Sequence, residues 1–277
     1  MCATKEFLVQ TVIIIIFNLE KNMLAEIVKE LAPTGVLRAA INMSNFLLVT
    51  GKTDDGDPVG VSPDMAGELA KRLGVGLELL KYKTPGEVAD DAGKGIWDIG
   101  NIGAEPQRAK KIDFTAAYCE IQATYMVPPD SKLTKLEDVD KAGIRIAVSA
   151  RSAYDLWLER NIKNAELIRV EGIDASFDIF MEKRLEALAG LRPRLITDVE
   201  RVPGAKILDG QFTAVQQAMG CTRGKEKAAS YLKTFVEEMK ASGFVEKAIE
   251  KHNVVGRLSV AALTSSKKIK LKDIKND

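Results

Sequence analysis

The order of apolar and polar positions predicts alternating strands and helices in the first half of the chain. A strand is expected at 36–41, a helix at 62–73, a strand at 77–82 and a further helix from residue 84. Ser62-Pro63 has the form of an N-cap followed by proline, and Thr84 with Glu87 has the form of a capping box. Such alternation is typical of α/β proteins with a mostly parallel sheet.

The second half of the chain repeats this alternation. Strands are predicted at 121–127, 144–148, 167–170 and 185–189, and helices from residues 152 and 176. The chain then returns through roughly 206–214, after which Thr222 is predicted to cap a long helix, and a last helix covers about 245–252. One further helix is predicted before the first strand, over 21–32.

Two asparagines come directly after the first predicted strand. Asn42 and Asn45 follow the apolar run 36–41. Because ligands of α/β sheets lie beyond the carboxyl ends of the strands, both side chains and that of Phe46 are candidate pocket residues.

The segment from Trp97 to Tyr118 holds the most informative chemistry. Gly103-Ala104-Glu105-Pro106 is a turn and helix-start signal, and Arg108 follows two residues after the proline, inside the predicted first helical turn. A guanidinium beside a helix N-terminus matches both oxygens of a carboxylate, and free backbone N–H groups add partial positive charge. From spacing alone, a solvated surface arginine is the alternative interpretation.

Length, composition and charge indicate a soluble globular chain. With 277 residues, of which 46% are hydrophobic and 29% charged, it can form one large or two ordinary domains. The net charge of +1 gives no general attraction to nucleic acid or to an anionic membrane. Three cysteines without a CxxC pair and a single histidine, His252, predict no disulfide framework, metal site or cofactor.

The two ends of the chain carry simple patterns. The apolar run from Phe7 to Phe17 is long enough for the hydrophobic region of a signal peptide but too short to span a bilayer. Only one lysine precedes it, next to a glutamate, and no typical cleavage site follows, so a working signal and a degenerate start both stay open. The tail 259–277, lysine-rich from Thr264, is predicted to be disordered.

The pattern D-x-x-x-x-G-x-E-P-x-R-A-x-x-I-D-F-T-x-x-Y, from Asp98 to Tyr118, resembles the ligand-binding segment of family 3 solute-binding proteins. These bilobed receptors deliver amino acids and related small molecules to ABC importers. Further similar pieces fall in the expected order: LAPTGVLRAAIN (31–42), GVSPDMAGELAKRLGV (60–75), RIAVSARSAYDLWL (145–158) and QQAMG before a long helical stretch (216–252). The resemblance covers roughly residues 31–255.

The resemblance implies an α/β fold of the periplasmic-binding-protein type 2 class, with two lobes, a ligand cleft and two crossing strands. Lobe 1 would comprise 31–121 and 207–258, and lobe 2 would comprise 122–206, after an N-terminal segment 1–30. The implied function is a monomer that closes on a small carboxylate-bearing solute and docks on a membrane ABC permease. Its place would be the periplasm or the cell exterior, with the cytoplasm left open by the unconvincing signal.

The resemblance also implies which residues bind the ligand. Arg108 corresponds to the family's carboxylate clamp, and Ser152 helps to hold the same carboxylate. Asn101 and Gly103 fall where the family often has serine or threonine in contact with the ligand. Glycine at position 103 would lose one such hydrogen bond, whereas Asn101 can both donate and accept.

Leu191 departs from the family's pattern. Amino-acid binders usually have an acidic residue here, which pairs with the ligand's α-ammonium, and a buried ammonium without a partner is costly. We therefore predict a carboxylate that lacks the α-amino group, or one with a second acidic group near Arg192. An exposed turn at Arg192 is the alternative interpretation.

Two other classes of function stay open. Cyclohexadienyl dehydratase-like enzymes are similar in fold and need a carboxylic acid of raised pKa facing the ligand. Because position 191 is leucine, the remaining acids for that role are Glu105, Asp155 and Glu186. A ligand-sensing regulatory domain, which would signal to a separate partner chain, is the third class.

Overall fold

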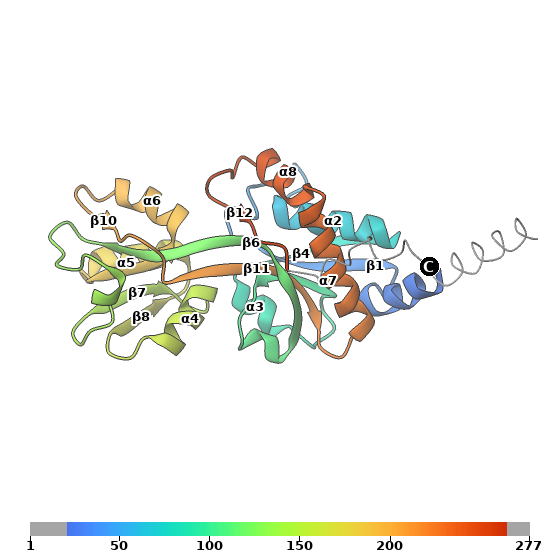
Figure 1. Cartoon of the computed structure of the whole chain (residues 1–277), viewed down its shortest axis with the longest axis horizontal. Helices are drawn as coiled ribbons and strands as arrows, with labels where there is room; N and C mark the ends of the chain where they lie inside the picture. Colours follow the sequence, from blue (N-terminus) through green and yellow to red (C-terminus); the bar gives the residue numbers. More distant parts are fainter. Residues whose placement is uncertain (1–20, 265–277) are drawn as a thin grey trace, which may run out of the picture.

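The chain folds into two α/β lobes joined by two long strands (Figure 1). The computed structural model describes residues 21–264. Lobe 1 contains a helical segment over residues 21–31 and β1 (Val36–Asn42), β2 (Gly51–Lys52), β3 (Pro58–Val59), α2 (Val61–Leu73), β4 (Gly76–Tyr82), α3 (Pro85–Asp90), β5 (Ile99–Gly103), a 3-10 helix (Arg108–Lys110), α7 (Glu226–Ala241), α8 (Phe244–Lys251) and β12 (Ser259–Val260).

Lobe 2 contains a 3-10 helix (Leu136–Asp138), β7 (Arg145–Ser149), α4 (Ala153–Asn161), β8 (Glu166–Val170), α5 (Ile173–Glu182), β9 (Ala187–Leu191), α6 (Arg192–Glu200) and β10 (Lys206–Ile207). The strands that run through both lobes are β6 (Ile112–Val127) and β11 (Thr213–Thr222). The predicted α/β alternation is confirmed in both lobes.

Apart from the separate pair β2–β3, the strands of both lobes form one continuous sheet across residues 21–264, with β6 and β11 at its centre. Its order is β4-β1-β5-β11-β6-β9-β7-β8. β1 lies parallel to β4 and β5, and β7 lies parallel to β8 and β9, whereas β11 and β6 are antiparallel to each other and to their outer neighbours. Each lobe is therefore a small parallel sheet, and two antiparallel strands connect them.

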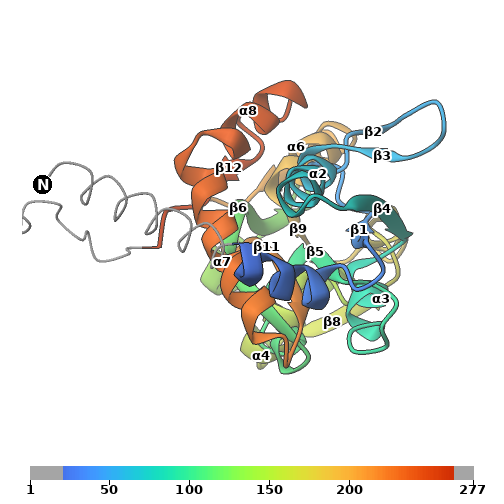
Figure 2. The same cartoon turned by 90° about the vertical axis from the view of Figure 1, so that its right-hand side faces the viewer.

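Helices cover both faces of the sheet in lobe 1, and Figure 2 shows α2 and α3 on opposite sides of β1 and β4. On the α2 side, Met65 packs in the same buried cluster as Ile41 of β1. On the α3 side, Val88 packs with Trp97, whose indole Nε1 donates a 3.0 Å hydrogen bond to the Val88 carbonyl. In lobe 2, Phe177 of α5 belongs to a separate buried cluster. The apolar side chains of the strands are thus buried under helices on both faces of the sheet.

The start of α2 differs from the prediction. The helix begins at Val61, its N-cap is Gly60, and Ser62 makes no capping bond. The Ser62 hydroxyl instead lies 2.9 Å from the hydroxyl of Tyr118, on the long strand β6. The predicted N-cap was wrong because a tertiary partner takes the side chain that the local pattern assigned to the helix.

Two further boundaries differ because strands run longer or later than the apolar pattern indicates. Thr222 is the last residue of β11 and pairs with Ile112, and α7 starts only at Glu226 after its N-cap Lys225. Thr222 therefore caps no helix. The strand predicted at 185–189 is β9, at Ala187–Leu191.

The beginning of the predicted tail is ordered. Ser259 and Val260 form β12, which pairs with β6, and Lys240 Nζ donates a 2.9 Å hydrogen bond to the carbonyl of Ala262. The prediction of disorder from residue 259 was therefore wrong for this part. The rest of the tail (265–277) and the signal-like run (7–17) lie outside the described residues. Among residues 21–264, no helix has the length and apolar character needed to cross a membrane.

Candidate functional site

A cavity of about 300 Å³ lies between the two lobes. The last residues of four parallel strands line it: Asn42 of β1, Gly103 of β5, Ser149 of β7 and Leu191 of β9. The first residues of three helices line it as well, at the starts of α3, α4 and α5. The cavity therefore occupies the position where α/β sheets bind ligands, beyond the carboxyl ends of their strands.

Arg108 lines the cavity and is only 5% exposed. Its Nη1 donates a 2.7 Å hydrogen bond to the Gly103 carbonyl, and its Nη2 donates a 2.9 Å bond to the Arg151 carbonyl of lobe 2. Burial lowers the pKa of Arg108 to about 10, so the guanidinium is charged at neutral pH. A guanidinium has five N–H groups, so these two hydrogen bonds leave other N–H donors of Arg108 for a carboxylate.

The backbone around Arg108 differs from the predicted helix start. Arg108 opens a 3-10 helix of three residues, which ends at Lys110. So short a helix carries little of the partial charge of a full α-helix N-terminus. The alternative of a solvated surface arginine is excluded by the burial of the side chain.

Ser152 lies at the cavity as the N-cap of α4, as the sequence predicts. Its Oγ accepts a 3.1 Å hydrogen bond from the backbone N–H of Asp155. The Ser152 side chain also hydrogen-bonds to the phenol of Tyr154. Tyr154, two residues further on, also lines the cavity, and burial raises its pKa to about 12, so the phenol is neutral at physiological pH.

Asn42 and Asn45 both line the cavity, and their side-chain oxygens hold the turn after β1. The Asn42 Oδ1 accepts from the backbone N–H and the hydroxyl of Ser44, at 3.2 and 2.8 Å. The Asn45 Oδ1 accepts from the N–H groups of Leu47 and Leu48, at 3.2 and 3.3 Å. Each amide therefore has its NH₂ group left to offer a ligand.

Gly103 and Asn101, on the same strand, lie in different surroundings. Gly103 lines the cavity, whereas Asn101 is 1% exposed and is not among the lining residues. Neither side-chain polar atom of Asn101 has a hydrogen-bond partner among the described residues. At Gly103, a Cβ would lie 2.9 Å from the Ala153 side chain of lobe 2 and 3.0 Å from that of Val215. Close approach of the lobes thus leaves no room for the serine or threonine typical of the family.

Leu191 lines the cavity, but its neighbour Arg192 does not. Leu191 is 6% exposed and presents an apolar side chain at the end of β9. Arg192 begins α6, and its Nη2 donates to the carbonyls of Leu208 and Gly210. The structure therefore gives no basis for the expected contact between Arg192 and a second acidic group of the ligand. The alternative of an exposed turn at Arg192 is not found either, because this residue begins a helix.

The sequence pattern missed two charged residues of the cavity lining, Lys83 and Glu171. Lys83 follows β4 and Glu171 follows β8, both parallel strands. The rule that singled out Asn42, a polar residue at the carboxyl end of a predicted strand, could have found both. Across residues 21–264, no group of three or more His, Cys, Asp or Glu side chains is arranged to hold a metal ion.

The three acids considered for a dehydratase all lie outside the cavity lining. Each is bound to an arginine: Glu105 to Arg160, Asp155 to Arg169, and Glu186 to Arg145. The hydrogen bonds from Arg145 lower the pKa of Glu186. A general acid needs the opposite shift, so Glu186 lacks the environment that this role requires, and Glu105 and Asp155 do not line the cavity.

Known proteins resemble this chain in both sequence and fold. The L-cystine-binding protein TcyJ of Escherichia coli strain K12 is 23% identical over 200 residues, which is 72% of this chain and 75% of TcyJ. The receptor for L-cysteine of Neisseria gonorrhoeae has a TM-score of 0.69 at 20% identity, over 83% of this chain and 97% of that one. The ancestral amino acid-binding protein AncCDT-1, a precursor of cyclohexadienyl dehydratase, has a TM-score of 0.66 at 23% identity, over 81% and 98%.

These structural likenesses show the fold, with its two lobes. A family model, that of the bacterial extracellular solute-binding proteins, family 3, matches residues 39–254 of the 277-residue chain. The match includes most of lobe 1, all of lobe 2, both connecting strands and all of the residues that line the cavity. The chain therefore belongs to the bacterial extracellular solute-binding proteins, family 3.

Proposed function

We propose that the cavity binds a small carboxylate-bearing solute through Arg108 and that the protein delivers it to a membrane ABC permease. The observation that carries this proposal is the burial of a charged guanidinium in the cavity lining, with two of its N–H groups held by backbone carbonyls. A fixed, desolvated guanidinium with donors to spare favours a carboxylate, whose two oxygens match its planar fork.

The arrangement of the lobes supports binding by closure. Arg108, Asn42 and Asn45 come from lobe 1, and Ser152 and Leu191 come from lobe 2. A ligand that contacts both sets makes its full number of contacts only when the lobes are together, so it stabilises the closed state. Bending of β6 and β11, the two strands that connect the lobes, would give the hinge.

The charges around the cavity favour an acid without an α-amino group. Its lining has one buried cation, Arg108, and two exposed residues of opposite charge, Lys83 and Glu171. Leu191 offers nothing to an ammonium group, and burying an unpaired ammonium costs several kcal/mol or so. We therefore propose an amino-free organic acid as the preferred ligand, although relatives are named for the amino acids L-cystine and L-cysteine.

Thermal shift measurements on the purified protein test this proposal. The panel pairs L-cysteine with 3-mercaptopropionate and L-arginine with 5-guanidinovalerate, and it includes L-cystine and prephenate. A ligand at 100 times its dissociation constant adds about 2.7 kcal/mol, or roughly 5–10 °C for a chain of this size. We expect larger shifts with the amino-free acids, and we expect prephenate to remain unchanged in the sample.

Two arginine variants separate the clamp from a general charge effect. Arg108→Gln should abolish the ligand-induced shift, because the carboxylate loses its charged partner. Arg145→Gln removes an arginine of lobe 2 that pairs with Glu186 outside the cavity, and it should leave the shift unchanged. A ligand-induced shift that persists in Arg108→Gln would contradict the proposed clamp.

Leu191→Asp tests the charge of the preferred ligand separately. A carboxylate at this lining position should raise the thermal shift with L-cysteine or L-arginine relative to the shift with the matching amino-free acid. Leu191→Asn is the uncharged control. If the parent protein already prefers the α-amino acids and Leu191→Asp adds nothing, the amino-free preference is wrong while the role of Arg108 stands.

A further inference from the structure

Arg151 joins the two lobes beside the cavity. It precedes α4 in lobe 2, and its Nη2 donates a 2.6 Å hydrogen bond to Asp90 and a 3.1 Å bond to the Gly86 carbonyl, both on α3 of lobe 1. Its own carbonyl accepts the 2.9 Å bond from Arg108, also of lobe 1. The side chain and the main chain of one residue therefore both contact the opposite lobe.

The backbone of Arg151 is held in an uncommon conformation. Its φ is 58°, in the left-handed region that residues other than glycine seldom adopt. The Arg151 N–H donates a 2.7 Å bond to Asp155, whose other oxygen is held by Arg169 at 2.8 Å. This bond network within lobe 2 fixes the direction in which Arg151 presents its carbonyl and its side chain.

The opposite surface of α3 is shaped to receive this side chain. A Cβ on Gly86 would lie 2.9 Å from the Arg151 Cζ and 3.0 Å from its Nε. Any larger residue at position 86 would therefore displace the guanidinium from its place. Asp90 lies one turn further along α3 and supplies the opposite charge. A glycine and an aspartate on one lobe thus match an arginine on the other in shape and in charge.

We propose that Arg151 is a positioning residue that favours the closed arrangement of the lobes and, through its carbonyl, orients Arg108 there. All three of its interlobe bonds are lost when the lobes separate. A second ion pair, between Arg160 of α4 and Glu105 of lobe 1, acts in the same direction. The proposal goes beyond carboxylate binding, and its part on closure does not depend on which ligand the cavity takes.

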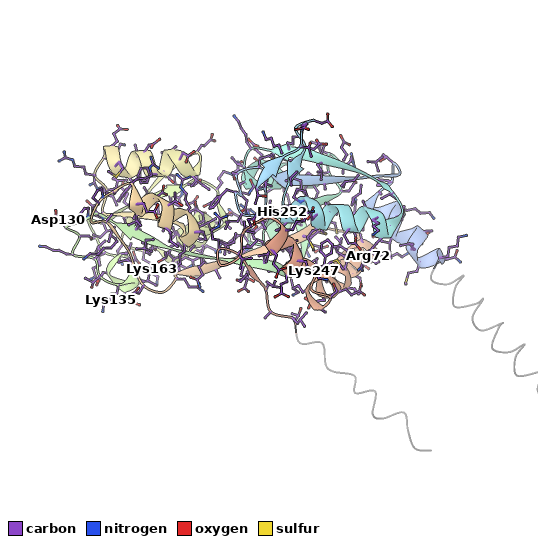
Figure 3. The ribbon with its side chains drawn as sticks, turned by 90° about the horizontal axis from the view of Figure 1, so that it is seen from above. Arg72, Asp130, Lys135, Lys163, Lys247 and His252 are labelled. Carbon is purple, nitrogen blue, oxygen red and sulfur yellow. The ribbon has the colours of Figure 1, made fainter. Side chains whose placement is uncertain are left out.

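Energy transfer between labels on the two lobes measures closure directly in the full chain without added ligand. Lys163 and Lys247 are exposed and lie in opposite lobes (Figure 3), so each is replaced by cysteine and labelled. Cys119 and Cys221 are buried and remain unlabelled, and Cys2 is replaced by serine. The readout is the ratio of open to closed molecules.

Arg151→Gly removes the side chain but retains the carbonyl and tolerates the left-handed backbone. We expect the ratio of open to closed molecules to rise about 1.4- to fivefold, the range for one exposed ion pair. The difference from the parent should disappear in 1 M NaCl, where such a pair is screened. Asp90→Asn should raise the ratio in the same direction but by no more than Arg151→Gly, because the bond to the Gly86 carbonyl remains, and the double variant should not exceed Arg151→Gly, which already lacks both side-chain bonds.

Arg145→Gln is the matched control, because its ion pair with Glu186 lies entirely within lobe 2. It should leave the ratio unchanged. The proposal is overturned if Arg151→Gly and Asp90→Asn leave the ratio at the parent's value, or if Arg145→Gln changes it equally. Melting temperatures verify that each variant is folded, and Asp90→Asn tests the same contact should Arg151→Gly fail to fold.

Discussion

Gly103 shows at the scale of one residue how closely the two lobes approach. A side chain here would meet Ala153 of α4 at 2.9 Å, a distance shorter than real Cβ contacts, and would also meet Val215 at 3.0 Å. Gly103 therefore lines the cavity with its backbone alone. Glycine here lacks the side-chain hydrogen bond that a serine or threonine would offer a ligand, and this absence therefore accompanies a closer fit between the two lobes.

Gly103→Ser should oppose closure of the lobes. Overpacking of a close contact costs about 1–3 kcal/mol, so the ratio of open to closed molecules should rise by about fivefold or more. The labelled protein with cysteines at 163 and 247 gives the measurement. Ala153→Gly in the same chain should restore part of the closed population, because it removes the Cβ that the serine meets. A Gly103→Ser protein as closed as its parent would refute the close contact.

At the scale of one element, the start of α2 depends on a glycine in an extreme conformation. Gly60 has φ 157°, and a Cβ there would lie 2.1 Å from the carbonyl oxygen of Leu48. The Leu48 carbonyl also accepts a 3.1 Å hydrogen bond from the Ser62 N–H. No side chain fits between the turn after β1 and the first turn of α2.

Gly60→Ala should therefore lower the free energy of unfolding by about 2 kcal/mol or more, because backbone must move to admit the methyl group. Gly67 lies inside the same helix, and a Cβ there would lie 4.0 Å from its nearest neighbour, the Leu77 side chain. Gly67→Ala should raise the stability by about 0.5–1 kcal/mol through better helix propensity. Urea denaturation of both variants measures these changes, and equal effects of the two substitutions would contradict this account.

The starts of the helices also show which local sequence signals are sufficient to predict a helix boundary. The capping box at Thr84 and Glu87 is present as predicted, with both reciprocal bonds formed. Its atoms lie within four residues, so the sequence contains all of the partners. Ser62 and Thr222 carry similar signals, yet one bonds Tyr118 and the other pairs in β11 with Ile112. Those partners are distant in sequence, and no local pattern reveals them.

At the scale of the whole molecule, closure depends on charges that face one another across the lobes. The hydrogen bond from Arg151 holds the pKa of Asp90 below its ordinary value, against the opposing effect of burial. Lys94 lowers it further and Asp91 raises it, and both lie on the same lobe as Asp90. Of these three charged neighbours, only Arg151 moves away from Asp90 when the lobes open. The pKa of Asp90 therefore returns toward the ordinary value in the open state.

Acid should therefore open the lobes. The contribution of Asp90 to closure is fully present above the ordinary aspartate pKa of about 4, and it is lost as the pH falls through the lowered value. The ratio of open to closed molecules should rise below about pH 4 in the parent, and the difference between parent and Asp90→Asn should vanish there. Far-UV circular dichroism shows whether the chain is still folded. If the ratio of open to closed molecules still differs between the parent and Asp90→Asn at low pH, the charge of Asp90 does not contribute to closure.

The sequence by itself determined the α/β alternation, most strand positions, the two local caps at Thr84 and Ser152, and the candidate clamp Arg108. These depend on the period of apolar residues and on contacts between near neighbours, which a linear pattern contains. Only the tertiary structure decided that Asn101 lies outside the cavity and that Arg192 binds backbone carbonyls. It also brought Arg151 against Gly86 and Asp90. Such contacts join residues distant in the chain, and those of Arg151 form only when the two lobes pack together.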